Sequence, residues 1–400
     1  MTTPEPTPFS FFSGRWLRPG WFFAGLALGF MALAVLGRQV VRRDYHPDFT
    51  RFFPAIAPEG SYYPTVEEMC AIVRERCRPD QVLVIVGGNS VLQGVWQPAD
   101  VLWSRRLQEQ LGDRYCVVNF ALRGAFATDG GAVIAEALRT EFPRQIYLAN
   151  EVPGRVIDPL GREDYRTIFW HGYFGGYLLP FAPRDAQVRT RFSQWNFLPV
   201  SLTARLDRWL RFDDVWNWLA FTHLNTVPSF YAATPPALFR PRQTFVDSEP
   251  DGSALTLDQR YLPAVRETEM KILRATTERT YERAADGGWH WLPEARQACE
   301  KSYREAFPES LRARTLMLIG RDSPFFRNQL SPDERARDEQ AVRDTVEAFR
   351  RQGYAAIDYG AGFGPEDYGD RIHLAPSGGA KLATTVAAQI RIMTETLHYQ

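Results

Sequence analysis

Short apolar runs that alternate with helical patterns constrain the fold of this chain more than any other feature. The first three runs lie at residues 81–86 (QVLVIV), 115–120 (YCVVNF) and 145–148 (QIYL). Continuous apolar runs of this length are typical of strands that are buried on both faces of a parallel sheet. The alternation therefore predicts an α/β fold with right-handed crossovers.

Helices are expected between and after these strands. Pro98 opens a segment in which Leu102, Leu107 and Leu111 recur at helical spacing, as proline often does at the first position of a helix. Further helices are expected at 129–142, 332–352 and 376–394, and further strands at 315–319 (TLMLI) and 355–359 (AAIDY).

The alternating pattern is interrupted once, between the third and the fourth strand. Residues 153–311 are rich in aromatic residues and prolines and lack alternating strands. This stretch is far longer than an ordinary loop. We therefore expect one sheet domain, residues 44–152 and 312–400, split by a large, mainly helical or irregular insertion. Within the insertion, residues 261–285 have the pattern of an amphipathic helix, and residues 287–307 are expected to contain another.

An uncharged apolar segment, residues 21–37 (WFFAGLALGFMALAVLG), follows an N-terminal tail of residues 1–20. As a helix it spans about 25 Å, and the flanking Arg and Trp side chains can extend it across a hydrocarbon core of about 30 Å. We expect one uncleaved transmembrane helix. A cleaved signal peptide is the first alternative, because Ala32-Leu33-Ala34 resembles a cleavage site, and a buried helix is the second. The flanking arginines, two before and three after, slightly favour a cytoplasmic location for the rest of the chain.

Charge and cysteine content narrow the classes of partner. Lys+Arg and Asp+Glu both total 47, so the charge balance gives no reason to expect nucleic acid as a partner. Cys70, Cys77, Cys116 and Cys299 include no C-x-x-C pair and lack a histidine at metal-ligand spacing, which argues against structural zinc. Cys70 and Cys77 are expected on one helix about two turns apart, too far for a disulfide. We expect four buried thiols.

The first candidate site follows the first strand, at residues 87–94 (GGNSVLQG). Open α/β sheets place their sites at the carboxyl ends of strands. Glycines allow a sharp turn there, and Ser90 on such a turn has a free hydroxyl and backbone N–H groups that can face an oxyanion. The alternative is a structural turn in which Ser90 only caps the next helix.

The second candidate site lies between the last strand and the last helix, at residues 370–378 (DRIHLAPSG). A serine hydroxyl is a poor nucleophile near neutral pH and needs a base, a task that suits histidine. Asp370, three residues before His373, can bond one ring nitrogen and leave the other facing the serine. Of six histidines, His373 alone has a carboxylate at this spacing in a strand-to-helix loop.

These motifs resemble the blocks of the SGNH/GDSL hydrolase superfamily. The sequence GNSVxxG at 88–94 is similar to the first block, and DxxH at 370–373 to the last. The second block pairs an asparagine on a strand with a glycine whose N–H enters the oxyanion hole, and NFALRG at 119–124 fits it. The third block, usually Gly-x-Asn-Asp, reads LANE at 148–151, so leucine replaces the glycine and glutamate the acid.

The resemblance implies an SGNH, flavodoxin-like, three-layer parallel sheet. It further implies Ser90 as nucleophile, His373 as base and Asp370 as the residue that orients the base. The oxyanion hole would consist of the N–H groups of Ser90 and Gly124 and the side-chain amide of Asn150. No metal and no organic cofactor is needed for this chemistry.

The resemblance also implies a function class: a serine-dependent acyl ester hydrolase or O-acyltransferase that forms an acyl-serine. Members with one N-terminal anchor and a large insertion resemble alginate O-acetyltransferases and the teichoic-acid D-alanylation protein, which modify the cell envelope beside a multi-span membrane acyltransferase. The expected substrate is an acylated polysaccharide or glycolipid, and such an acyltransferase is a candidate partner. The expected location is the bacterial inner membrane, with residues 21–37 in the lipid and the catalytic domain in the periplasm.

Two other interpretations fit the same residues. The chain could be a free-standing lipase or carbohydrate esterase, or a catalytically silent scaffold whose SGNH-like domain binds a polymer or partner. The aromatic residues of the insertion suit carbohydrate stacking or a lid on the membrane interface, and equally a second small core.

Overall fold

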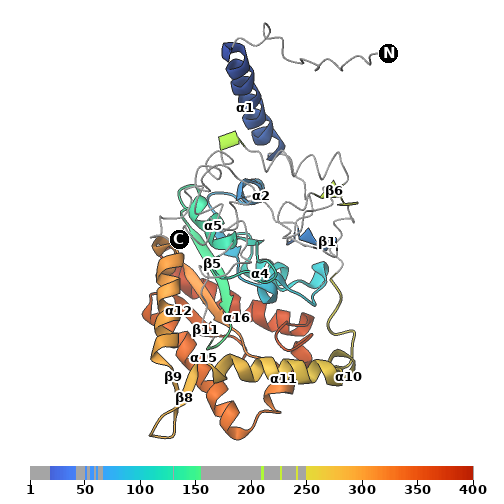
Figure 1. The fold of residues 1–400 in the computed structure, drawn as a ribbon, viewed down its shortest axis with the longest axis vertical. Coiled ribbons are helices and arrows are strands. Elements are labelled where there is room, and N and C mark those ends of the chain that lie inside the picture. Colours follow the sequence, from blue (N-terminus) through green and yellow to red (C-terminus); the bar gives the residue numbers. More distant parts are fainter. Residues whose placement is uncertain are drawn as a thin grey trace, which may run out of the picture.

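A five-stranded parallel sheet organises the computed structural model of this protein (Figure 1). Its strands are β3 (Val82–Val86), β4 (Tyr115–Asn119), β5 (Gln145–Glu151), β10 (Thr315–Ile319) and β11 (Ala355–Asp358). The structure describes residues 19–41, 50–51, 55–57, 60–61, 66–128, 130–154, 209–210, 226–227, 240–241 and 249–399.

The strand order is β11-β10-β5-β3-β4, and every pairing within this sheet is parallel. Counted along the chain, this is the 2-1-3-4-5 order of flavodoxin-like sheets. The predicted α/β class and parallel sheet are therefore confirmed. The order reverses between β3 and β5, and sheets of this kind form a crevice at such a point, beyond the carboxyl ends of the strands.

Two helical layers cover the sheet, because alternate side chains of each strand face opposite sides. On one side, Leu83 and Ile85 pack in a core that also contains buried residues of four helices longer than a single turn. These are α2 (Val66–Arg76), α5 (Gly130–Ala137), α12 (Pro293–Ala306) and α15 (Pro332–Arg351). On the other side, Val84 and Val86 pack with α4 (Trp103–Leu111) and α16 (Pro376–Thr396). The fold has the three layers that were predicted.

Smaller elements complete the described chain. They are β1 (Ala55–Ala57), β2 (Gly60–Ser61), α3 (Ser90–Gln93), η1 (Ala99–Val101), β6 (Thr226–Val227), β7 (Arg240–Pro241), α10 (Leu257–Arg260), α11 (Pro263–Glu278), β8 (Tyr281–Arg283), β9 (Trp289–Trp291), α13 (Glu309–Arg312), α14 (Pro324–Arg327) and η3 (Pro365–Asp367).

The second half of the predicted insertion packs on the sheet domain. Tyr303 of α12 is fully buried in the same core as β3, so this helix belongs to one of the two layers. The prediction of a helix over 261–285 is wrong at its end, because α11 stops at Glu278 and β8 pairs with β9 in an antiparallel hairpin. Gly287, at φ 81° in the turn, accounts for the change of direction. The aromatic-rich first part of the predicted insertion, residues 155–208, lies outside the described residues.

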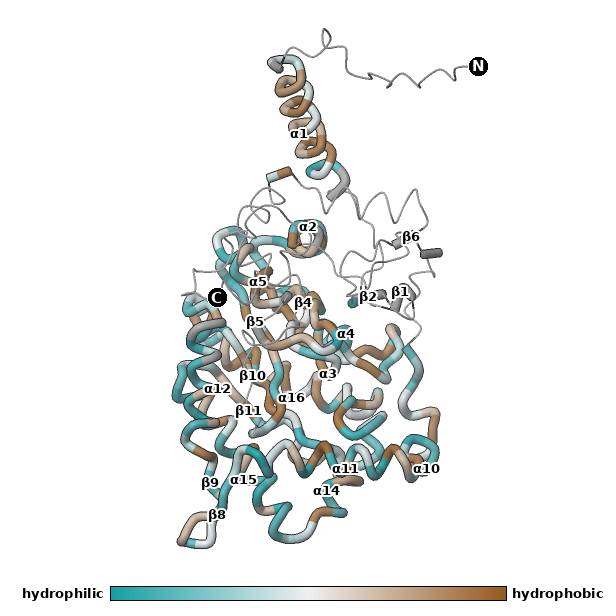
Figure 2. Tube along the Cα trace, viewed as in Figure 1, coloured by the Kyte–Doolittle hydropathy of each residue, from teal (hydrophilic) through white to brown (hydrophobic). Residues whose placement is uncertain are grey.

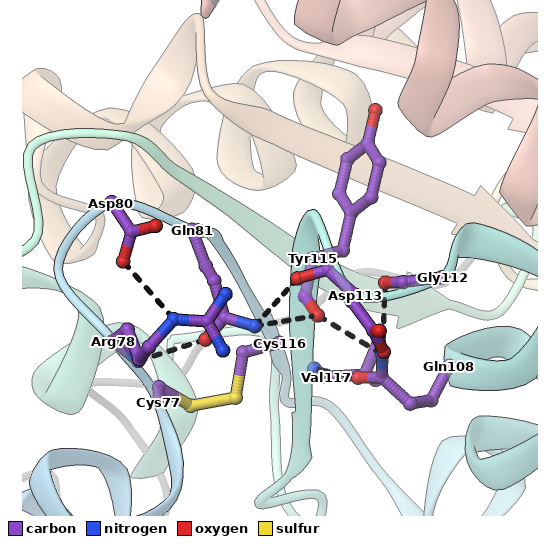
Figure 3. The surroundings of a disulfide bond; sticks show 10 residues. All are labelled: Cys77, Arg78, Asp80, Gln81, Gln108, Gly112, Asp113, Tyr115, Cys116 and Val117. Atoms are coloured by element: carbon purple, nitrogen blue, oxygen red, sulfur yellow. Dashed lines mark hydrogen bonds and ion pairs between the residues drawn. A yellow bond between two sulfur atoms is a disulfide. The ribbon is translucent and has the colours of Figure 1, made fainter.

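A disulfide joins Cys77 to Cys116, so the prediction of four thiols is wrong (Figure 3). Cys77 directly follows α2, and Cys116 lies on β4, whose edge position in the sheet brings the two Cα atoms to 5.6 Å. Disulfides require such short separations. The pairing spans 39 residues and arises from the packing of α2 beside the sheet, which no local pattern encodes. Cys70 and Cys299 are buried and are not part of a disulfide.

Helix α1 (Pro19–Val41) is the N-terminal apolar helix that was predicted. Its residues Gly20–Gln39 are apolar enough and long enough to cross a membrane. Figure 2 shows that α1 is largely hydrophobic along its length, and aromatic side chains such as Trp21 and Phe23 are exposed on it. Length and composition qualify this helix as a membrane span, and a signal sequence passes the same criteria.

Candidate active site

Ser90 lies at the carboxyl end of β3, directly beyond a turn made by two glycines. Gly88 has φ 80°, and a Cβ there would come within 3.0 Å of the Asn150 backbone nitrogen, so only glycine fits. Asn89 is the N-cap of α3, and its Oδ1 accepts a hydrogen bond from Val91 N at 2.9 Å. Ser90 is therefore the first residue of a helical turn and remains partly exposed.

His373 and Asp370 lie in the loop between β11 and α16, and this loop meets the serine turn. His373 Nε2 is 2.7 Å from Ser90 Oγ, across 283 residues of sequence. His373 Nδ1 is 2.7 Å from Asp370 Oδ2. The other oxygen, Asp370 Oδ1, accepts hydrogen bonds from the backbone N–H groups of Ile372 at 3.0 Å and His373 at 2.8 Å. The structure thus brings together the three side chains that the sequence singled out.

Asp370 is held as a carboxylate. Burial raises the pKa of Asp370, but the hydrogen bonds and charge of His373 and a hydrogen bond from the Trp96 indole outweigh burial and lower the pKa to about 2. Trp96 Nε1 donates to Asp370 Oδ2 at 2.8 Å. An ionised carboxylate beside Nδ1 can orient the imidazole and stabilise its charged form.

Arg371, between the aspartate and the histidine, fixes this loop from behind. Its guanidinium donates to Glu269 Oε2 of α11 at 2.5 Å and also pairs with Asp322, which follows β10. The backbone contributes a further bond, from Ser323 N to Arg371 O at 2.7 Å. Both Arg371 and Asp322 are almost buried, so the loop is anchored to the end of a neighbouring strand.

Asn150 lies at the end of β5, beside the serine turn. Its Oδ1 accepts from Asn89 N at 3.0 Å, and its Nδ2 donates to Asn89 Oδ1 at 2.9 Å. An amide nitrogen carries two protons, so one N–H of Asn150 is engaged with Asn89 and the second is a candidate oxyanion donor. Glu151, the residue that departs from the third block, instead accepts a hydrogen bond from Tyr303 OH of α12 in the core.

Gly124 is exposed in the loop that follows β4, at φ 67°. This loop contacts the serine turn, because Leu122 N donates to Gly88 O at 3.1 Å. Asn119, at the end of β4, supports the same arrangement through its Nδ2, which donates to Leu92 O at 3.0 Å. The second predicted block thus supplies an asparagine that holds α3 and a glycine in the adjoining loop.

Arg51 is a contributor that the sequence reasoning missed. This buried side chain donates to three backbone carbonyls around the carboxyl end of α3, those of Gln93 at 3.1 Å, Gly94 at 2.5 Å and Gln97 at 2.7 Å. A cation is favourable at a helix carboxyl end, where carbonyl groups lack intrahelical partners. Arg51 therefore fixes the serine turn from the side opposite Ser90, and no motif in the sequence announces it.

Within the described part of the chain, no group of three or more His, Cys, Asp or Glu side chains is arranged to hold a metal ion.

Comparisons with known proteins give structural likenesses only. No family model matches the sequence, and no curated protein matches it either. An inhibitor-bound aryl esterase from M. smegmatis is similar at 13% identity and a TM-score of 0.30, covering 78% of this chain and 99% of that one. A carbohydrate acetylesterase from Sinorhizobium meliloti is similar at 10% identity and a TM-score of 0.30, covering 78% and 100%. A putative arylesterase from Agrobacterium tumefaciens is similar at 14% identity and a TM-score of 0.28, covering 78% and 99%. Likeness at these TM-scores assigns neither substrate nor activity to this chain.

Proposed function

We propose that this chain is a serine-dependent acyl ester hydrolase or O-acyltransferase of the SGNH/GDSL type. The observation that carries the proposal is the continuous chain of contacts from Ser90 Oγ through the His373 ring to Asp370 Oδ2, at 2.7 Å and 2.7 Å. Nucleophile, base and orienting carboxylate are recognised by this geometry rather than by fold.

In the proposed reaction, Ser90 Oγ attacks the ester carbonyl carbon while His373 Nε2 takes the hydroxyl proton. The N–H groups of Ser90 and Gly124 and the second N–H of Asn150 stabilise the oxyanion of the tetrahedral intermediate. Collapse of this intermediate breaks the bond to the leaving alcohol, which receives the proton from His373. The acyl-serine is then attacked by water or by another hydroxyl, with His373 again as base.

We propose an envelope polysaccharide or glycolipid as substrate and a catalytic domain outside the cytoplasm, anchored in the membrane by α1. The Cys77–Cys116 disulfide supports this location, because disulfides persist mainly in oxidising compartments. A multi-span membrane acyltransferase remains a candidate partner and source of acyl groups.

The central experiment is labelling of the purified chain with a fluorophosphonate, combined with hydrolysis of p-nitrophenyl acetate. Wild type should be labelled and active, and Ser90→Ala should lose both. Ser377→Ala is a matched control, because Ser377 is an exposed serine four residues after His373. A folded wild-type chain that is neither labelled nor active would instead favour the silent polymer- or partner-binding scaffold.

A second experiment separates hydrolase from transferase. Release of p-nitrophenol is followed with and without an oligosaccharide acceptor, and products are analysed by mass spectrometry. Acylated oligosaccharide that depends on Ser90 supports transfer. Free acetate as the only acyl product supports hydrolysis. The acceptor concentration must be high enough that a further increase does not change the rate.

A further inference from the structure

Trp96 holds an unusual backbone conformation next to the candidate triad. It follows α3 by three residues and has φ 68°, one of two positive values among the described residues that are not glycine. A bulky side chain is a genuine outlier there, and such conformations persist only where the surroundings enforce them. The indole donates to Asp370 Oδ2, the same oxygen that faces His373 Nδ1.

The Asp370 carboxylate is thereby fully engaged. Its Oδ1 accepts two backbone N–H groups, and its Oδ2 faces both His373 Nδ1 and Trp96 Nε1. A carboxylate offers about four acceptor positions, so these contacts define its rotation completely. The indole N–H can donate a hydrogen bond but cannot accept one. Trp96 therefore stabilises the Asp370 carboxylate and cannot take the proton of His373.

The conformation of Trp96 is enforced by residues 249–252 of the insertion. Glu249 Oε1 accepts from Trp96 N at 3.0 Å, and Gly252 N donates to Trp96 O at 2.9 Å. The packing is tight, because a Cβ at Gly252 would lie 2.8 Å from Trp96 Cβ, and one at Gly369 would collide with the indole. Both backbone polar groups of Trp96 are therefore bound by residues 249–252.

The same glutamate also reaches the loop that carries Gly124. Glu249 Oε2 pairs with the guanidinium of Arg123, whose Nε donates to Gln93 Oε1 of α3 at 3.1 Å. The Glu249 side chain is only 6% exposed, so its charge depends on contacts within the protein, among them those with these two loops. One buried carboxylate from the insertion thus connects the support of Asp370 with the residue next to the candidate oxyanion donor.

We propose that Trp96 and Glu249 are positioning residues for the reaction, a proposal that rests on the function proposed above. Glu249 holds Trp96 in the conformation that orients the Asp370 carboxylate, and it holds Arg123 so that Gly124 keeps its place. The insertion therefore completes the active site, in addition to any part it plays in binding substrate.

The test compares kcat and KM for p-nitrophenyl acetate, normalised to fluorophosphonate-labelled sites. Trp96→Phe should lower kcat about tenfold or more, because hydrogen bonds to charged groups are among the stronger ones, and should leave KM within about twofold. Glu249→Ala should cause a similar loss. Glu249→Gln keeps an acceptor for Trp96 N but loses the ion pair with Arg123, so its loss should be smaller.

A double-variant cycle distinguishes positioning from general weakening of the fold. If both residues act through one carboxylate, Trp96→Phe with Glu249→Ala should lose little more than the worse single variant. Matched controls are Trp291→Phe, a buried indole in β9, and Glu141→Gln, an exposed partner of Arg74. Both should keep wild-type kcat.

Different results would overturn the positioning role and the proposed function. Wild type that labels, with Trp96→Phe and Glu249→Gln at wild-type kcat per site, overturns the positioning role and leaves the serine mechanism intact. A multiplicative loss in the double variant also overturns it. If Trp96→Phe fails to fold, Glu249→Ala, which removes the acceptor for Trp96 N, decides the question in its place. Wild type that never labels removes the proposed function itself.

Discussion

Asn89 and Asn150 hold each other through two hydrogen bonds, from Asn89 N to Asn150 Oδ1 at 3.0 Å and from Asn150 Nδ2 to Asn89 Oδ1 at 2.9 Å. The residue before the serine is thereby tied to the end of β5. Because Asn89 Oδ1 also caps α3, this pair fixes both the serine turn and the direction of the remaining Asn150 N–H.

Substitution of Asn89 and substitution of Asn150 should differ in their effect on kcat. Asn89→Ala and Asn150→Ala both remove the pair, and loss of the N-cap in Asn89→Ala should cost about 1 kcal/mol of stability. Only Asn150→Ala also removes the proposed oxyanion donor, so its kcat should fall by about 10²–10³. Kinetics of ester hydrolysis per labelled site measure the difference. Equal losses in the two variants would assign Asn150 a purely structural role.

Asp370 should contribute to the dependence of stability on pH. Its pKa is lowered to about 2 in the fold, against about 3.9 in an unfolded chain. The ionised carboxylate therefore stabilises the fold above about pH 4, and this contribution is lost as the pH falls through about 2. The difference in Tm between wild type and Asp370→Asn should be greatest near neutral pH and should shrink towards pH 2.

The matched control for this titration is Asp80→Asn, an exposed carboxylate at the other end of the sheet. Its Tm difference should stay small throughout. Asp370→Asn should also lower kcat by about 10³–10⁴, because an amide presents the wrong partner to the imidazole. A Tm difference that does not change between neutral and acidic pH would contradict the proposed ionisation of Asp370.

Removal of the disulfide should destabilise the chain. Because Cys77 and Cys116 have a sequence separation of 39, loss of the cross-link should cost about 4 kcal/mol through the entropy of the unfolded state. Cys77→Ala/Cys116→Ala should show this as a lower midpoint in urea, and reduction of wild type should do the same. Cys70→Ala, which alters a buried thiol on α2 outside the disulfide, is the control, and reductant should lower its midpoint as it does for wild type.

Arg371 should be needed for stability as well as for the position of His373. Arg371→Met leaves Asp322 buried without its main cation, and breaking such a pair typically costs about 3–5 kcal/mol. Burial raises the pKa of Asp322 even beside Arg371, so the variant should regain stability as the pH falls and the acid becomes neutral. Urea unfolding at pH 7 and pH 5 measures this.

The second variant in that series is Asp322→Asn/Arg371→Met. It lacks the buried charge, so it should be more stable at pH 7 than Arg371→Met alone and less dependent on pH. A double variant that is less stable than either single variant would mean that lost packing, rather than the buried charge, explains the loss of stability.

Local patterns predicted the parts of the fold that depend on local chemistry. The strand and helix periods placed β3, β4, β5, β10 and β11 within a few residues, because buried parallel strands are continuous apolar runs. Ser90 and His373 could be singled out because a glycine turn and a DxxH spacing are readable in sequence. Asp286-Gly287 was a turn signal that could have revealed the β8–β9 hairpin.

Contacts between distant segments could not be predicted in this way. The Cys77–Cys116 bond depends on where α2 ends beside β4, and a count of cysteine spacings carries no such information. Glu249 and Arg51 act on backbone groups, which any sequence can present, so no partner motif marks them. Their roles become visible only once the chain has folded around the serine turn.

The hydrogen bonds of Arg51 to the turn after Ser90 limit how far this turn can lie from α1. Helix α1 ends at Val41, and the ten residues from there to Arg51 can span at most about 35 Å in any conformation. If α1 is embedded in a bilayer, this short connection holds Ser90 close to the membrane surface. Ser90 would then work in a thin zone beside the lipid, and molecules diffusing beyond that zone would have to come to it.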